Sequence, residues 1–181
     1  WRVAGADPDP VAVANGRKAG LDVRPGGIDA FADAAGQFDV ITLNHVIEHV
    51  HDPVETLRKA YALLKPGGRL YIDTPNIDSY GHQSYKEDFL HLDPPRHLIV
   101  LNYYSMGVLL RKGSFVEIEY IHCPWVNIDV VTASPGNAGM YKKRGGKVLN
   151  LLNKLRLNYS WGSEREKTEF ITVIAKKPVN Q

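Results

Sequence analysis

Three ionisable side chains, His45, Glu48 and His49, stand close together in this chain of 181 residues. On a helical turn, residues three and four positions apart share a face, so the three side chains could converge. Imidazole and carboxylate groups can move a proton, orient neighbouring loops or bind a divalent metal. The spacing also matches the His-x-x-Glu-His pattern of zinc proteases, but neither a third ligand nor a long helix accompanies it. We therefore favour hydrogen-bonding and orienting roles without a metal, and keep a metal site as the alternative.

A second group of such side chains lies in residues 75–98, which are polar and rich in Pro, His and Asp. This stretch lacks a helical or strand period, and so long an irregular segment is typical of a functional lid or binding loop. Histidine is suited to taking a proton from a hydroxyl group near neutral pH. Each of these residues taken alone is more typical of a surface or packing position. Among them together, however, we expect one to reach a substrate. The candidates are His82, Tyr85, His91, Arg96 and His97.

Alternating strands and helices must position these residues. Such alternation implies a mostly parallel sheet with right-handed crossovers and helices on both faces, and ligands bind beyond the carboxyl ends of its strands. Residues 38–44 are apolar and β-branched enough for a strand that is buried on both faces. The predicted strands are 2–6, 21–23, 38–44, 69–74, 116–122 and 170–175, and the predicted helices are 11–19, 53–64, 104–112 and 146–157. Residues 28–35 are expected to form a loop or a short helix, and residues 45–50 a short helical turn.

Composition indicates one globular domain over residues 1–181, with 44% hydrophobic and 23% charged residues. The net charge of +2 is too small to favour nucleic acid, and the basic cluster at 142–147 is typical of a solvated face. No apolar run approaches the roughly 20 residues of a membrane span. The single cysteine, Cys123, excludes an internal disulfide and indicates a reducing compartment, so we expect a cytoplasmic protein.

Three segments together resemble the class I S-adenosylmethionine-dependent methyltransferase family, over about residues 1–76. Residues 3–10 form a strand that ends in an acidic residue before a helix. Residues 38–53 form a strand and an acidic turn, and residues 64–76 contain a Lys-Pro-Gly-Gly turn that leads into a strand. Residues 93–98, with a later helix followed by Gly-Ser-Phe, more weakly resemble the branch that acts on small molecules, quinone precursors and sugars.

The resemblance implies a Rossmann-like, doubly wound α/β fold that ends in an antiparallel strand pair. It also implies S-adenosyl-L-methionine as the cofactor and methyl transfer to a hydroxyl, amine or carbon of a small-molecule acceptor. A rival interpretation is a non-catalytic Rossmann-like module that binds a cofactor or nucleotide. A nicotinamide-dependent oxidoreductase fits the segments at 38–53 and 64–76 less well. The sequence does not determine the oligomeric state.

By this resemblance, Asp7 and Pro8 end the strand that carries the cofactor's ribose. A carboxylate at that position can accept charge-assisted hydrogen bonds from both ribose hydroxyl groups. The alternative is an ordinary turn aspartate before a proline. We expect the ribose role for Asp7.

Two further loops are expected to contact the cofactor. Glycine occupies the usual acidic position beside adenine, so the main chain of Ile28 and Asp29 would serve there, unless the loop is only a Gly-rich turn. Asn44 and His45 end a central strand where the family's main chain lies against the methionine part of the cofactor. For Asn44 the alternative is capping of the strand end.

On the acceptor side, the resemblance favours His97 and Arg96 as catalytic residues, together with His49, and residues 75–98 as an active-site lid. Some quinone-precursor O-methyltransferases similar to residues 45–49 hold a divalent cation with acidic residues and a histidine. Here His45 replaces an acid, which would change the ligand character toward softer metals.

The first strand and helix of the family, with the Gly-x-Gly-x-x-Gly loop, have no counterpart in the sequence. In the family this loop lets the main chain approach the cofactor's methionine carboxylate. We expect the whole protein to contain this segment, because a parallel sheet without its central strand exposes strand edges and core.

Overall fold

The computed structural model describes residues 1–121 and 165–179. Cys123, the basic cluster at 142–147 and the helix expected at 146–157 lie outside this part of the chain. The other expected strands and helices are confirmed. The strands are β1 (Ala4–Asp7), β2 (Asp22–Pro25), β3 (Phe38–Asn44), β4 (Leu64–Pro75), β5 (Val116–Ile121) and β6 (Phe170–Lys176), and the helices are α1 (Pro10–Lys18), α2 (Pro53–Leu63), α3 (Tyr80–Tyr85) and α4 (Tyr103–Lys112).

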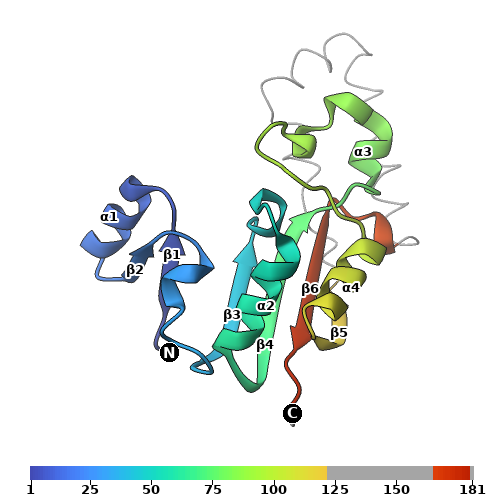
Figure 1. Ribbon diagram of the computed structural model, residues 1–181. Coiled ribbons are helices and arrows are strands. Elements are labelled where there is room, and N and C mark those ends of the chain that lie inside the picture. Colours follow the sequence, from blue (N-terminus) through green and yellow to red (C-terminus); the bar gives the residue numbers. More distant parts are fainter. Residues whose placement is uncertain (122–164, 180–181) are drawn as a thin grey trace.

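The strands form two hydrogen-bonded groups, a pair β1-β2 and a sheet in the order β3-β4-β6-β5. Pairing is parallel between β1 and β2 and between β3 and β4, and antiparallel from β4 to β6 and from β6 to β5. Figure 1 shows β1 on the side of its pair that is nearer to β3. Among the described strands, the ladder is interrupted between β1 and β3. The expected α/β fold with its closing antiparallel strands is confirmed.

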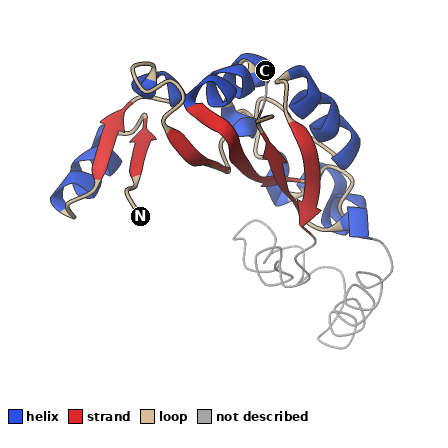
Figure 2. Cartoon of the chain, turned by 90° about the horizontal axis from the view of Figure 1, so that it is seen from below, coloured by secondary structure: helices blue, strands red, loops and turns tan. Residues whose placement is uncertain are grey.

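Helices α2 and α4 contact each other and cover one face of the four-stranded sheet (Figure 2). Each helix has a local start signal. The Asp52 carboxylate accepts the N–H of Glu55 before Pro53, and Asn102 begins α4 with a capping box. The two helices and the sheet enclose the main core, in which the buried side chains include Leu57, Met106, Leu110, Ile72 and Val173. No helix in the described ranges is long and apolar enough to cross a membrane.

Strand β3 is not buried on both faces, and this prediction was wrong. Val40 is 52% exposed, and Leu43 is the buried residue of the strand. Among the described elements, α2 and α4 cover one face of the sheet, and Val40 lies on the face of the strand opposite to the buried Leu43. The buried central strand is β4.

Strand β4 also begins earlier than residue 69, directly after α2. The Lys-Pro-Gly-Gly stretch continues the strand, and the N–H of Gly67 donates to the carbonyl oxygen of Lys177 at 3.0 Å. Gly67 has a φ of +77°, a backbone conformation that favours glycine.

Residues 75–98 are more regular than predicted. They contain α3 and two 3-10 turns, Lys86–Asp88 and Leu90–Leu92. Ser79 caps α3 by accepting the N–H of His82, and Phe89 is buried. The segment is fixed at its start by a bridge between Asn76 and Leu101 and at its end by the N–H of Leu98, which donates to the Glu48 carbonyl. These elements are too short to produce a recognisable period in the sequence.

Candidate active site

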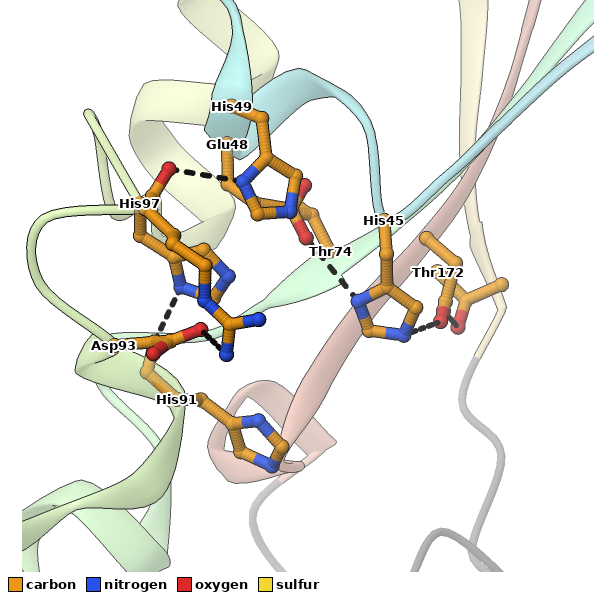
Figure 3. Close-up of polar contacts among 10 residues, drawn as sticks. His45, Glu48, His49, Thr74, His91, Asp93, His97 and Thr172 are labelled. Atoms are coloured by element: carbon orange, nitrogen blue, oxygen red, sulfur yellow. Dashed lines mark hydrogen bonds and ion pairs between the residues drawn. The ribbon is translucent and has the colours of Figure 1, made fainter. Parts of the chain in front are cut away.

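The polar residues gather where β3 and β4 end. The two strands are parallel, and Asn44 pairs with Asp73 in the ladder. The N–H of His45 then donates to the Asp73 carbonyl at 2.9 Å, which brings the turn after β3 against the end of β4. Figure 3 shows His45, Glu48 and His49 on this turn, with His91 and His97 approaching from the neighbouring segment.

Glu48 is a buried carboxylate at the centre of this group, with 1% of its surface exposed. It contacts His45 Nδ1 at 3.1 Å through Oε1 and accepts the Thr74 hydroxyl at 2.9 Å through Oε2. Burial by itself would raise the pKa of Glu48, but its hydrogen bonds, above all the one to His45, lower it overall. Its carbonyl also accepts the N–H of Leu98 at 2.8 Å. Glu48 therefore joins both strand ends to the segment that carries His97.

His45 lies between two carboxylates. Its Nε2 is 3.6 Å from Asp73 Oδ2, on the opposite side of the ring from Glu48, and Asp73 accepts the hydroxyl of Thr172. The hydrogen bond to Glu48 raises the pKa of His45 despite partial burial. His45 has a φ of +50°, which costs energy in a residue other than glycine. The fold thus favours the protonated form of a strained imidazole and pairs it with Glu48.

His49 and His97 are arranged differently from His45. His49 Nδ1 lies 2.9 Å from the carbonyl oxygen of Arg96, and His97 Nδ1 lies 2.7 Å from the carbonyl oxygen of His91. A carbonyl oxygen only accepts, so both Nδ1 atoms donate, and in each neutral ring the lone pair lies on Nε2. The ring centroids are 4.7 Å apart. Two imidazole lone pairs are therefore available side by side to take a proton.

Glu48, His49 and His97 also present three metal-ligating atoms within 4.8 Å of one another. Two imidazole nitrogens and one carboxylate suit a divalent transition metal, and the two backbone carbonyls that accept from Nδ1 fix the orientation of the rings. These residues fit a cation. The convergence expected of His45, Glu48 and His49 is only partly observed, because His97 takes the place of His45 in this group.

His91 is a third kind of histidine in the site. Burial, followed by the charges of His45 and His97, lowers its pKa to about 4. Its ring packs against Phe89 and Phe170, and its Nε2 is buried without a hydrogen-bond partner in the described structure. His91 is therefore a neutral group in the wall of the site.

Other candidates on the acceptor side are less central. The Arg96 guanidinium pairs with Asp93 and is 75% exposed, so it is the carbonyl of Arg96 that enters the site. The His82 ring packs against Phe89. The side chain of Tyr85 lies outside the described structure.

On the cofactor side, Asp7 Oδ1 accepts the N–H of Asp9 at 2.8 Å, and Asp9 in turn caps α1. The turn role considered for Asp7 is thus present, and the ribose role stays a prediction. Asp29 pairs with Lys59 at 2.7 Å, and Ile28 packs on the core beside it. Pro8 and Asn44 are exposed at the ends of β1 and β3.

Sequence reasoning missed Asp73, Thr172, Phe170 and Glu169. Asp73 and Thr172 are opposite each other in the antiparallel β4-β6 ladder, although they are 99 positions apart. Asp73 could have been found from its place at a strand end. The other three follow only from the pairing of β6, for which the sequence contains no local signal.

The sequence of this chain is similar to those of known proteins. A family model described as a methyltransferase domain matches residues 1–116. A ubiquinone biosynthesis O-methyltransferase of Xanthomonas axonopodis pv. citri is 46% identical over 48 residues, covering 26% of this chain and 20% of that protein. The matched segments span between 20% and 32% of the length of the first curated relatives.

Solved structures show the same fold. A SAM-dependent methyltransferase from Archaeoglobus fulgidus superimposes with a TM-score of 0.59 and 18% identity, over 96% of this chain and 75% of that one. A Haemonchus contortus phosphoethanolamine N-methyltransferase 2 in complex with S-adenosyl-L-methionine gives a TM-score of 0.58 and 15% identity, over 98% of this chain and 43% of that one.

Proposed function

Because the chain belongs to the methyltransferase family, we propose that the whole protein transfers a methyl group from S-adenosyl-L-methionine to a small-molecule acceptor. The observation that carries the proposal is the pair of Nε2 lone pairs on His49 and His97, at the strand ends where α/β proteins bind their ligands. The structure bound to S-adenosyl-L-methionine among the similar folds supports the choice of cofactor.

The reaction is an in-line displacement. The acceptor's nucleophilic atom forms a bond to the methyl carbon, the bond from that carbon to the sulfonium sulfur breaks, and S-adenosylhomocysteine leaves. An acceptor hydroxyl group also has to lose its proton. The protein must align the two reactants and accept that proton, which the Nε2 atom of His49 or His97 is placed to do. The alternative is a cation held by Glu48, His49 and His97, which would occupy the Nε2 lone pairs and would polarise the acceptor oxygen in place of a histidine base.

The acceptor atom that we propose is a hydroxyl oxygen. A hydroxyl benefits most from a nearby base, because its pKa lies far above neutral pH, and two imidazoles are available here. The Xanthomonas relative is named an O-methyltransferase, which agrees with this choice. A non-catalytic cofactor-binding module, the rival interpretation, does not require a base at this position.

We also propose that residues 75–98 cover the acceptor during transfer. They contribute His91 and His97 to the site and are fixed at both ends by backbone hydrogen bonds. A lid of this kind shields the displacement from water. The small net charge of +2 supports a small-molecule partner without nucleic acid, and the single cysteine supports a cytoplasmic location.

The proposed cofactor site is tested by changing Asp7. In the whole protein, Asp7→Ala is expected to weaken binding of S-adenosyl-L-methionine by about 1–3 kcal/mol, because the ribose hydroxyls lose a charged acceptor. Asp39→Ala, which removes an exposed aspartate paired with Lys65, is the matched control and should leave affinity unchanged. Calorimetric titration measures both. An unchanged dissociation constant in Asp7→Ala, with the fold intact by circular dichroism, would show that the ribose binds elsewhere.

A further inference from the structure

Glu169 is a buried acid next to the site that the proposed reaction does not use. It directly precedes β6 and is 3% exposed. Its Oε1 accepts the N–H of Gly81 at 2.8 Å, whereas Oε2 is buried without a hydrogen-bond partner among the described residues. A buried acceptor left unpaired costs free energy, so its presence calls for an explanation.

The carboxyl group packs directly on α3. A Cβ atom added to Gly81 would lie 2.7 Å from Oε1 of Glu169 and 2.7 Å from the Phe89 ring, and closer still to Oε2. Only glycine permits this approach. The contact therefore joins β6, the start of α3 and the Phe89 ring at one point.

Backbone hydrogen bonds fix the same junction. The N–H of Asn76 donates to the Glu169 carbonyl at 2.9 Å, and its side-chain amide donates to the Thr168 carbonyl at 2.7 Å. Asn76 is fully buried. The end of β4 and the residues before β6 are thus held together independently of the Glu169 side chain, which alone reaches on to Gly81.

A displacement of α3 at the contact between Glu169 and Gly81 would also displace histidines on the acceptor side of the site. Phe89, which packs on Gly81, also packs against the ring of His91 at a centroid distance of 5.2 Å. The carbonyl of His91 in turn holds Nδ1 of His97 at 2.7 Å. The positions of two histidines of the site therefore depend on the place of α3.

The surroundings of Glu169 stabilise the ionised form of its carboxyl group poorly. Burial, only partly offset by the hydrogen bond from the Gly81 amide, raises the pKa of Glu169 to about 7. The charged and titratable side chains on the elements that pack around Glu169 interact with residues other than Glu169. Within the described chain, His82 and His91 pack on Phe89, Lys167 lies over the Tyr80 ring, and Asp78 accepts from Asn102.

We propose that Glu169 is a positioning residue, whose neutral carboxyl group holds α3 and residues 86–91 in place and whose ionisation releases them. The consequence for catalysis rests on the proposed methyl transfer, but the contact itself does not. Since the folded-state pKa lies above the usual value of 4.5, the stabilisation is fully present below about pH 4.5 and is lost as the pH rises through about 7.

Hydrogen exchange of the whole protein tests this without an acceptor or a cofactor. Between about pH 5.5 and about pH 8, the protection factors of residues 79–91, corrected for intrinsic exchange, are expected to fall on the order of tenfold or more. Glu169→Gln keeps the shape but cannot ionise, and the protection of residues 79–91 should change much less between the two pH values than in the wild type. Glu166→Gln, an exposed acid on the same loop, is the matched control and should behave like the wild type.

Constant protection in the wild type would overturn the inference, and so would an equal loss in Glu169→Gln. The wild-type result decides the matter even if the glutamine variant does not fold. In the methyl-transfer assay, turnover of the wild type should decline above about pH 7, and Glu169→Gln should keep its turnover there. An inactive protein whose protection still changes with pH would refute the proposed function alone, whereas an active one with constant protection would refute this inference alone.

Discussion

Replacing His97 with alanine is expected to lower kcat for methyl transfer by about 100-fold or more, while the Kd for S-adenosyl-L-methionine stays nearly unchanged. The reason is the position of its Nε2 lone pair beside His49 on the acceptor side, with Nδ1 committed to the carbonyl of His91. A residue that serves the acceptor contributes to the transition state without contributing to cofactor binding. Arg96→Ala should also reduce turnover, but by less, because the carbonyl that holds His49 remains.

The measurements are turnover, cofactor affinity and melting temperature on the same proteins. His51→Ala removes a nearby exposed histidine and should match the wild type in all three. If His97 only fixes residues 75–98 to the sheet, its variant will lose melting temperature together with activity. A large loss of stability or cofactor affinity, without a selective loss of turnover, would refute both the catalytic role and the lid.

The second large effect is expected on stability. Glu48→Ala should lower the free energy of unfolding by about 2–4 kcal/mol, because it opens a cavity and leaves the Thr74 hydroxyl and His45 without their acceptor. Glu48→Gln keeps the volume and should cost less. Urea unfolding followed by circular dichroism measures both, with Glu119→Gln as an exposed control. A Glu48→Ala protein as stable as the wild type would show that this network does not hold the site together.

The same network predicts a pH dependence. The lowered pKa of Glu48 means that its contribution is present above about pH 4.5 and is lost as the pH falls through the folded-state value. The raised pKa of His45 means that its contribution is fully present below about pH 6.5 and is lost as the pH rises through its folded-state value. The pair therefore stabilises most between these limits. In Glu48→Gln the melting temperature should fall less than in the wild type outside this range, as the pH drops below about 4.5 or rises above about 6.5.

Much of the fold was predictable because its signals are local. Asp52 and Pro53 mark the start of α2, and Asn102 marks the start of α4, since capping depends on residues a few positions apart. The burial of β3 was predicted wrongly because exposure depends on which elements cover each face of the sheet, and Val40 lies on the face opposite to the buried Leu43. Residue type alone does not determine which face is covered.

The site was predictable only in part for the same reason. Helical spacing correctly predicted the contact between His45 and Glu48, because the two residues are three positions apart in the sequence. The pairing of His49 with His97 depends on the path of residues 75–98, and that of Asp73 with Thr172 depends on the register of β6. The choice of His97 came from the weak resemblance at residues 93–98. The histidine pair itself became visible only in the structure.

The central claim is that this fold binds S-adenosyl-L-methionine and passes on its methyl group. Calorimetric titration of the whole protein with S-adenosyl-L-methionine, S-adenosylhomocysteine and NAD tests it most directly, because the three ligands separate a methyltransferase from other Rossmann-like proteins. We expect binding of the first two and none of NAD, since the chain belongs to the methyltransferase family and the histidine pair beyond β3 and β4 suits the acceptor of a methyl group. Tight binding of NAD, with no response to S-adenosyl-L-methionine or S-adenosylhomocysteine, would contradict the claim.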